Sequence, residues 1–200
     1  MERFVDYLYD VDFVLIVSVF GRGCVGEMLA YAHHCALDPY TNRPIAGHVN
    51  FCPAALKSMK SIEFSHGMNT VKHELTHAFV FAPPLYPYFP GAGPPQRDGK
   101  VNLIPNVAQR FTRVDWETSK GPMEHDVYMI TTPKVREEAR RHFNCSTLEG
   151  AEVENHGPPA TIFAHWEKRV FEVGYFQKIS RNVVLIEVGI KEEMWEIGDE

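Results

Sequence analysis

The stretch MNTVKHELTHAFV, residues 68–80, decides how the rest of the sequence is interpreted. Its apolar side chains recur three or four positions apart, which predicts a helix with one buried face. That face consists of Val71, Leu75, Ala78 and Phe79. Asn69 or Thr70 would cap the amino end, and the helix is expected to end before two consecutive prolines, Pro83 and Pro84.

Two histidines and a glutamate within this helix have the spacing HExxH: His73, Glu74 and His77. Residues four positions apart lie on one face of a helix, so both imidazoles can bind the same Zn²⁺ ion. Glu74 directly follows the first histidine and would act as the general base toward a metal-bound water. The motif therefore predicts a zinc site in which Glu74 is catalytic.

A third ligand is required, because catalytic zinc usually has three protein ligands and one water. The sequence contains no glutamate between residues 78 and 116, which argues against a thermolysin-like arrangement. Val80 and Pro83 stand where the compact pattern HExxHxxGxxH requires Gly and His. The third ligand must therefore come from farther along the chain.

Four later histidines are candidates for the third ligand. His142 lies in a charged helical segment, and His125 and His156 lie in polar segments, so these three are expected at the surface. His165 follows the apolar stretch 160–164 and precedes Trp166. On these grounds His165 is the favoured third ligand.

Working outward, the amino-terminal part predicts mainly strands. Residues 11–20 are rich in Val, Phe and Ile, which is typical of a central strand buried on both faces. Residues 26–36 fit a short helix or an edge strand, and residues 47–51 fit another short strand that ends at Pro53.

The carboxy-terminal part predicts a loop, a helix and one ambiguous segment. The density of Pro and Gly in residues 83–100 predicts a long irregular surface loop. A second helix is expected to start at Thr132-Pro133, because proline suits the first helical position. Residues 182–190 are apolar enough for a buried strand or helix. Together these elements predict an α+β fold.

Composition excludes several classes of protein. The chain has 200 residues, 44% of them hydrophobic, so it can form a core. A net charge of −6 argues against a nucleic-acid partner or an extensive electrostatic grip on anionic membranes. No apolar run approaches the length of a transmembrane helix. The acidic amino terminus does not fit a secretory signal, so we expect an intracellular protein or a fragment of a longer one.

The four cysteines leave two interpretations open. Cys24, Cys35 and Cys52 fall within 29 consecutive positions, which suits a local disulfide. Buried free thiols explain the same residues equally well.

Beyond HExxH, several blocks of the sequence resemble the leishmanolysin family of zinc metallopeptidases. The similar blocks are residues 43–53, 71–79, 132–152 and 165–169, and the resemblance extends over residues 12–172. It implies a metzincin-like core with an active-site helix, a small mixed sheet and a long Pro/Gly-rich insertion. It also implies that His73, His77 and His165 bind one Zn²⁺ per chain and that Glu74 is the base.

The resemblance further implies a domain layout and a function. Residues 1–200 would form a single, partial catalytic domain, with an insertion at 81–131 and a carboxy-terminal subdomain at 132–200 that carries the third ligand. The expected activity is zinc-dependent endopeptidase cleavage of proteins or peptides. The resemblance allows peripheral membrane or cell-surface association and leaves the compartment open between extracellular and cytoplasmic.

Three positions depart from the family pattern. Val80 stands where the family has Gly, which predicts strain at a positive φ angle or a longer helix. Phe176 stands where the metzincin Met-turn has Met, and Cys145 would lack its usual disulfide partner. Val80, Phe176 and the short carboxy-terminal part motivate an alternative, a catalytically impaired zinc-binding or cell-adhesion relative of the same family.

Overall fold

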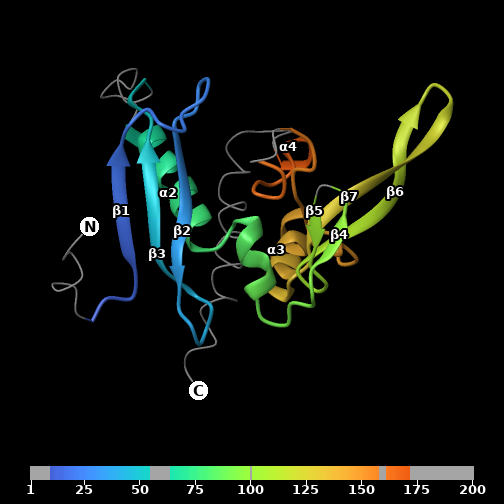
Figure 1. The fold of residues 1–200 in the computed structure, drawn as a ribbon. Coiled ribbons are helices and arrows are strands. Elements are labelled where there is room, and N and C mark those ends of the chain that lie inside the picture. The colour runs from blue at the N-terminus through green and yellow to red at the C-terminus, as the bar shows by residue number, and fades with distance from the viewer. Residues whose placement is uncertain (1–9, 55–63, 100, 158–160, 172–200) are drawn as a thin grey trace. The chain divides into compact units, whose positions relative to one another are not determined.

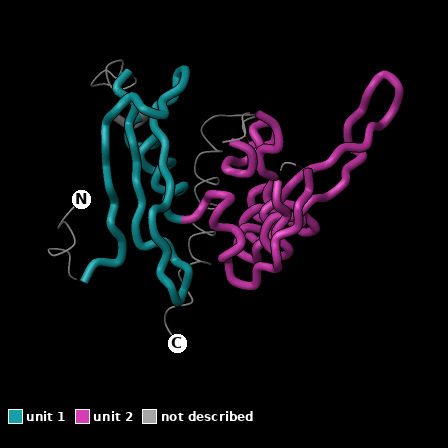
Figure 2. Tube along the Cα trace, in the orientation of Figure 1, with its two compact units in different colours: residues 1–79 teal, residues 80–200 magenta. Residues whose placement is uncertain are grey.

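A computed structural model describes residues 10–54, 64–99, 101–157 and 161–171, with the side chains of 64–66 left aside. The chain divides into two compact units, Met1–Phe79 and Val80–Glu200 (Figure 2). Each combines strands with at least one helix, so the predicted α+β class is confirmed. Among the described residues, no helix is both long and apolar enough to cross a bilayer.

Unit 1 is built on a three-stranded sheet with the order β1-β3-β2 (Figure 1). The strands are β1 (Val14–Val19), β2 (Ala30–Leu37) and β3 (Pro44–Phe51). β3 pairs with β1 in parallel and with β2 antiparallel. The predicted strand at 47–51 is therefore confirmed as the middle strand. The segment 26–36, left open between helix and edge strand, contributes an edge strand.

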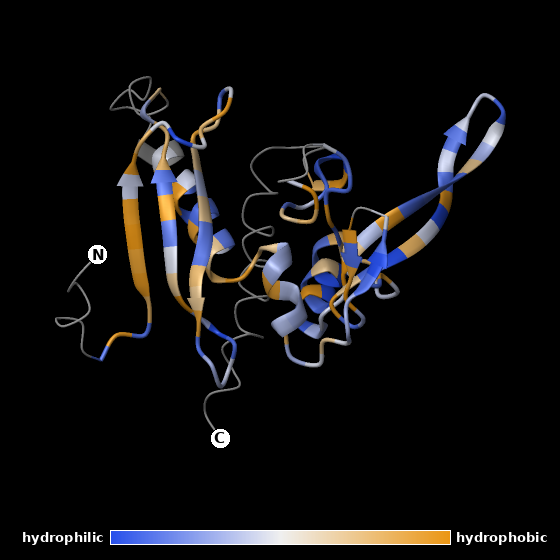
Figure 3. Cartoon of the chain, in the orientation of Figure 1, coloured by the Kyte–Doolittle hydropathy of each residue, from blue (hydrophilic) through white to orange (hydrophobic). Residues whose placement is uncertain are grey.

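The prediction that residues 11–20 form a central strand was wrong. β1 lies at an edge of the described sheet, and it is apolar along its length (Figure 3). Ile16, Val17 and Val19 each expose more than half of their accessible surface. A segment rich in Val and Ile indicates a strand, but it does not show which of its side chains will be buried against a neighbouring element.

Helix α2 (Phe64–Phe79) packs on one face of this sheet, against β2 and β3 (Figure 1). The close approach depends on Gly47 of β3, because a Cβ there would lie 3.1 Å from the Cβ of Ala78. The predicted helix is confirmed, but Asn69 and Thr70 lie inside it rather than at its cap. It ends at Phe79, and Val80 is not among the residues with positive φ, so the expected strain is absent.

A disulfide joins Cys24 to Cys52, which decides between the two interpretations of the cysteines. It ties the segment before β2 to the end of β3. Cys35 and Cys145 are free thiols.

Unit 2 contains a long hairpin and a short third strand that pairs with it. The hairpin is formed by β6 (Ala108–Thr118) and β7 (Gly121–Ile130), and β7 also pairs with β8 (Ala151–Glu152). A separate ribbon is formed by β4 (Gln96–Asp98) and β5 (Val101–Leu103).

The prediction of an irregular surface loop at 83–100 was wrong. The segment begins with the 3₁₀ helix η3 (Pro83–Tyr88) and ends in β4. Leu85 and Tyr86 of η3 are almost completely buried. Proline fits the first turn of a helix. Pro83 and Pro84 count as signs of irregular structure in the sequence, but here they form the first turn of η3.

Helix α3 (Pro133–Phe143) begins at the predicted Thr132-Pro133 pair and buries Val135 and Ala139. It ends at Asn144, which adopts the left-handed conformation that often terminates helices. A last short helix, α4 (Lys168–Phe171), closes the described part of unit 2. The predictions for Phe176 and for residues 182–190 lie outside the described residues.

Candidate metal centre

Helix α2 brings the two histidines of the HExxH motif together. The Nε2 atoms of His73 and His77 lie 3.0 Å apart, and their rings are nearly perpendicular at 89°. Two nitrogens that each bind a tetrahedral zinc ion at 2.0–2.1 Å would be separated by roughly 3.3 Å. The two imidazoles therefore fit a shared zinc ion with a small adjustment of their side chains.

Glu74, one residue beyond His73, is buried, which is unusual for a side chain that is normally ionised and exposed to water. Only 6% of its surface is exposed, and burial raises the pKa of its carboxyl group to about 7. A carboxyl group with a pKa near neutrality can both accept and return a proton at physiological pH. The role of Glu74 as a base stays a prediction, which its burial and this pKa support.

The other predicted ligand, His165, belongs to unit 2 and lies on a turn rather than on a helix. This turn, residues 161–165, is here called the His165 turn (Figure 1). An isolated bridge between Val153 and Trp166 anchors its carboxy end next to β8. Phe163 adopts a left-handed conformation with φ of 65°, which is unusual for a bulky residue.

Buried contacts hold the His165 turn in this conformation. The Tyr86 hydroxyl, from η3, donates a hydrogen bond to the carbonyl oxygen of Phe163. The Phe163 amide donates to the carbonyl oxygen of Glu154 at 2.9 Å, and the Glu154 amide donates to that of His165 at 2.8 Å. The position of His165 thus depends on residues outside its own turn, and no pattern in the sequence points to Tyr86 or Glu154.

Glu167 and Arg169 support the same region. The guanidinium group of Arg169 donates two hydrogen bonds of 2.8 Å to the two carboxylate oxygens of Glu167. It also lies over the ring of Trp116 from β6, 5.5 Å from the ring centre. This pairing lowers the pKa of Glu167, so its carboxyl group stays ionised although it is buried.

The other histidines considered as third ligand have different environments. His125 was expected in an exposed polar segment, but it lies on β7. Its ring stacks on that of Trp116, with the ring centres 3.8 Å apart. His142 is not a surface residue, because it is half-buried with its ring 6.0 Å from that of Phe171. His156 is exposed, as predicted. Aromatic neighbours thus explain the burial of His125 and His142.

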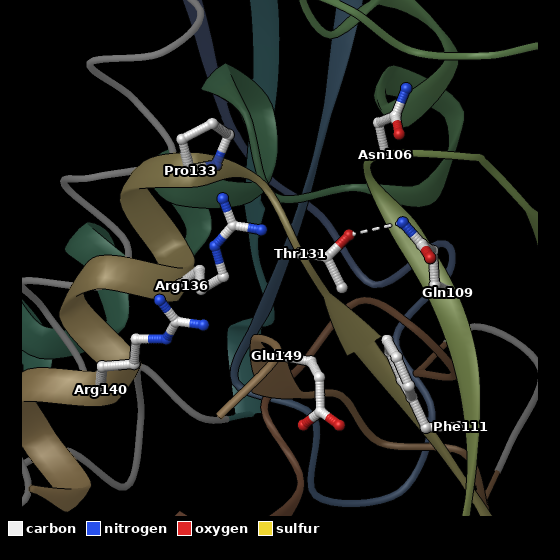
Figure 4. Close-up of a pocket in the computed structure, with 8 residues that line it drawn as sticks. All are labelled: Asn106, Gln109, Phe111, Thr131, Pro133, Arg136, Arg140 and Glu149. Atoms are coloured by element: carbon white, nitrogen blue, oxygen red, sulfur yellow. Dashed lines mark hydrogen bonds between the residues drawn. The ribbon is translucent and has the colours of Figure 1, made fainter. Parts of the chain in front are cut away.

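A separate pocket of about 470 Å³ lies between α3 and the hairpin within unit 2 (Figure 4). Gln109 donates to the Thr131 hydroxyl at 3.0 Å, and Arg140 donates to the Leu148 carbonyl oxygen at 2.8 Å. Glu149 is paired with Arg113 at 2.6 Å. None of the described residues that line the pocket is a histidine or a cysteine.

Comparison with known proteins places the chain among metallopeptidases. A sequence profile described as leishmanolysin matches residues 3–185. The leishmanolysin-like peptidase of Caenorhabditis elegans is 41% identical over 180 residues, which cover 82% of this chain and 27% of that protein. That of Drosophila melanogaster is 37% identical over 180 residues, covering 82% and 26%.

A more distant relative, the leishmanolysin homolog of Crithidia fasciculata, is 27% identical over 169 residues, covering 84% of this chain and 21% of that protein. The chain spans roughly a quarter of the length of these curated relatives. The match to the family profile nevertheless includes nearly the whole chain, with the HExxH helix and the His165 turn inside it. The chain belongs to the leishmanolysin family of metallopeptidases.

Proposed function

We propose that the chain is the catalytic part of a zinc-dependent endopeptidase with a metzincin-like core. His73, His77 and His165 would hold one Zn²⁺ ion per chain, and Glu74 would be the general base. The observation that carries the proposal is the geometry of α2, where two imidazole nitrogens lie 3.0 Å apart beside a buried carboxyl group. The assignment of His165 as third ligand rests on the family resemblance.

The residues of this chain would divide the work as follows. A zinc ion held by the three imidazoles would supply a Lewis acid that lowers the pKa of water and polarises the scissile carbonyl. Glu74 would accept the proton of the attacking water and return it to the departing amine. Its raised pKa of about 7 suits both steps. The substrates would be proteins or extended peptides, which commonly add a strand to an exposed sheet edge.

Substitution of Glu74 by Gln tests this proposal. The variant keeps the shape of the side chain but cannot accept a proton, so hydrolysis of an unfolded protein such as casein should fall by at least about 100-fold. Zinc content, measured by elemental analysis, should stay at one ion per chain in both proteins. Glu137→Gln, an exposed position on α3, is the matched control and should change neither quantity.

Two results would contradict the proposal. A wild-type chain without zinc would refute the metal site, and a Glu74→Gln variant with undiminished zinc-dependent cleavage would refute the base. The impaired, zinc-binding or adhesion relative is the second candidate, motivated by Val80 and Phe176. Zinc binding by the wild-type chain without any cleavage would favour it. The negative φ of Val80 weakens the reason that rests on this residue.

A further inference from the structure

The immediate surroundings of His165 suggest a role for a residue that is neither a predicted ligand nor the predicted base. The Nδ1 atom of His165 lies 3.3 Å from the carbonyl oxygen of Thr161 and 3.5 Å from Oε2 of Glu154. Both neighbours are hydrogen-bond acceptors. A proton on Nδ1 is therefore favoured, and in the neutral ring this leaves the lone pair on Nε2.

Glu154 is placed to exert this influence. Its Oε2 atom is buried and has no hydrogen bond to any described residue, and only 15% of the side chain is exposed. The backbone of Glu154 is fixed at both its amide and its carbonyl by the bonds to His165 and Phe163. Burying a carboxylate oxygen that forms no hydrogen bond reduces the stability of the folded chain, so a glutamate at this position needs an explanation.

We propose that Glu154 is a positioning residue, which holds the His165 ring with Nδ1 protonated and Nε2 available as a ligand. The inference rests on the proposed function, in which His165 is the third zinc ligand. Histidines that bind metals commonly donate their other ring N–H to a carboxylate or carbonyl group, which fixes the tautomer and strengthens the ligand. In the described structure, Glu154 and Thr161 are the acceptors that face this nitrogen.

The alternative is that Glu154 and His165 form a plain ion pair that stabilises the turn. The two roles differ in what they predict for the metal-free protein. A positioning role requires the neutral ring to carry its proton on Nδ1, whereas a purely structural pair does not depend on which nitrogen binds a metal. The tautomer is therefore the most direct quantity to measure.

The first experiment uses the wild-type, metal-free 200-residue chain labelled with ¹⁵N at histidine. At pH 8, the chemical shifts of the His165 ring nitrogens should report a proton on Nδ1 and a lone pair on Nε2. A proton on Nε2 would overturn the inference, and this measurement does not depend on whether any variant folds.

The second experiment compares zinc affinity, by competition with a chromophoric chelator, between wild type and Glu154→Gln. The amide of Gln can turn its N–H₂ group toward Nδ1, so the variant loses the preference for the useful tautomer. Zinc affinity should fall about 10- to 100-fold, the usual effect of losing such a partner. Melting of the metal-free variant should resemble that of wild type. Glu137→Gln, with the same charge change on α3, should bind zinc as wild type does.

The possible results distinguish a failure of the proposed zinc site from a failure of the role proposed for Glu154. A wild-type chain that binds no zinc overturns the proposed function, and the inference with it. A wild-type chain that binds zinc, with Glu154→Gln binding it equally well, overturns the inference alone.

Discussion

The helix that carries His73 and His77 and the turn that carries His165 are built in different ways. On α2, the spacing of the residues and the geometry of any helix suffice to bring the two rings together. The His165 turn contains a hydrogen bond from the Ala164 amide to the Thr161 carbonyl oxygen, but its conformation also depends on Tyr86, on Glu154 and on the bridge to Val153. The proposed site thus combines ligands placed by local geometry with one placed by tertiary contacts.

This difference predicts where the chain tolerates change. A substitution of His73 or His77 on α2 should act mainly on the proposed metal site, because neither side chain is fully buried. A substitution under the His165 turn should act first on the turn and only then on the metal. The following predictions test this contrast.

Removal of a ligand from either region should have the largest effect. His77→Ala and His165→Ala should each weaken zinc binding by more than about 100-fold, beyond the range of outer partners such as Glu154. The melting temperature of the metal-free protein should stay close to that of wild type in both cases, since neither ring is fully buried. Chelator competition and thermal melting check this. Unchanged zinc affinity in His165→Ala would show that another residue supplies the third ligand.

A test of the supports compares two glycines. A Cβ at Gly150, which precedes β8, would lie 2.1 Å from the backbone oxygen of Ile130. A Cβ at Gly47, under α2, would meet the tip of the Phe13 ring at 2.8 Å, which can turn aside, and the Cβ of Ala78 at 3.1 Å, where α2 would have to shift by a few tenths of an ångström. Gly150→Ala should therefore reduce the free energy of unfolding by about 3 kcal/mol or more, and Gly47→Ala by about 1 kcal/mol.

Urea unfolding followed by circular dichroism measures both glycine variants. An equal loss in both would mean that the backbone near Gly150 shifts as easily as the Phe13 side chain. The tertiary support of the His165 turn would then be softer than the described contacts indicate.

The same contrast explains which features could be predicted from the sequence. The HExxH helix and the start of α3 at Thr132-Pro133 were predicted correctly, because their signals lie within a few residues. β1 was misassigned as a central strand, since composition does not reveal which neighbours a strand finds. The burial of Tyr86 could not be predicted, because the prolines around it favour a surface loop.

The environment of a histidine is the hardest feature to predict. His125 has polar neighbours in sequence, but its partner Trp116 lies across the hairpin, nine positions away. Glu154 is one of many glutamates in the sequence, and no spacing or motif predicts its contact with His165, eleven positions later. Both relations arise from the pairing of β6, β7 and β8, which the sequence analysis did not predict.

A smaller effect is expected from the Tyr86 hydroxyl. Tyr86→Phe removes the hydrogen bond to the Phe163 carbonyl and leaves that buried oxygen with one partner fewer. The cost should be about 1–2 kcal/mol. Because Phe163 is held at φ of 65°, the turn should also open more often. Hydrogen exchange of the Phe163 amide should accelerate, whereas exchange of the α2 amides should not. Equal acceleration in both regions would indicate global destabilisation.

The smallest effect concerns charge beside the His165 turn. Burial, together with the nearby carboxylate of Glu167, raises the pKa of Glu152 to about 7. The folded chain therefore keeps a proton that the unfolded chain releases near pH 4.5, so stability is lost as the pH rises through this interval. Above pH 7 the folded state carries the full cost of this buried charge.

Glu152→Gln should remove that cost without altering the shape of the side chain. At pH 4 the variant and wild type should melt together, because the Glu152 side chain is then mostly uncharged in both the folded and the unfolded chain. At pH 8 the variant should melt about 2–4 °C higher, corresponding to about 1 kcal/mol in a chain of this size. Solvent screening keeps the effect small, because the side chain is only half-buried. The same rise in melting temperature at both pH values would mean that better packing stabilises the variant. The neighbouring carboxyl groups of Glu152 and Glu167 would then not make the stability of the chain depend on pH.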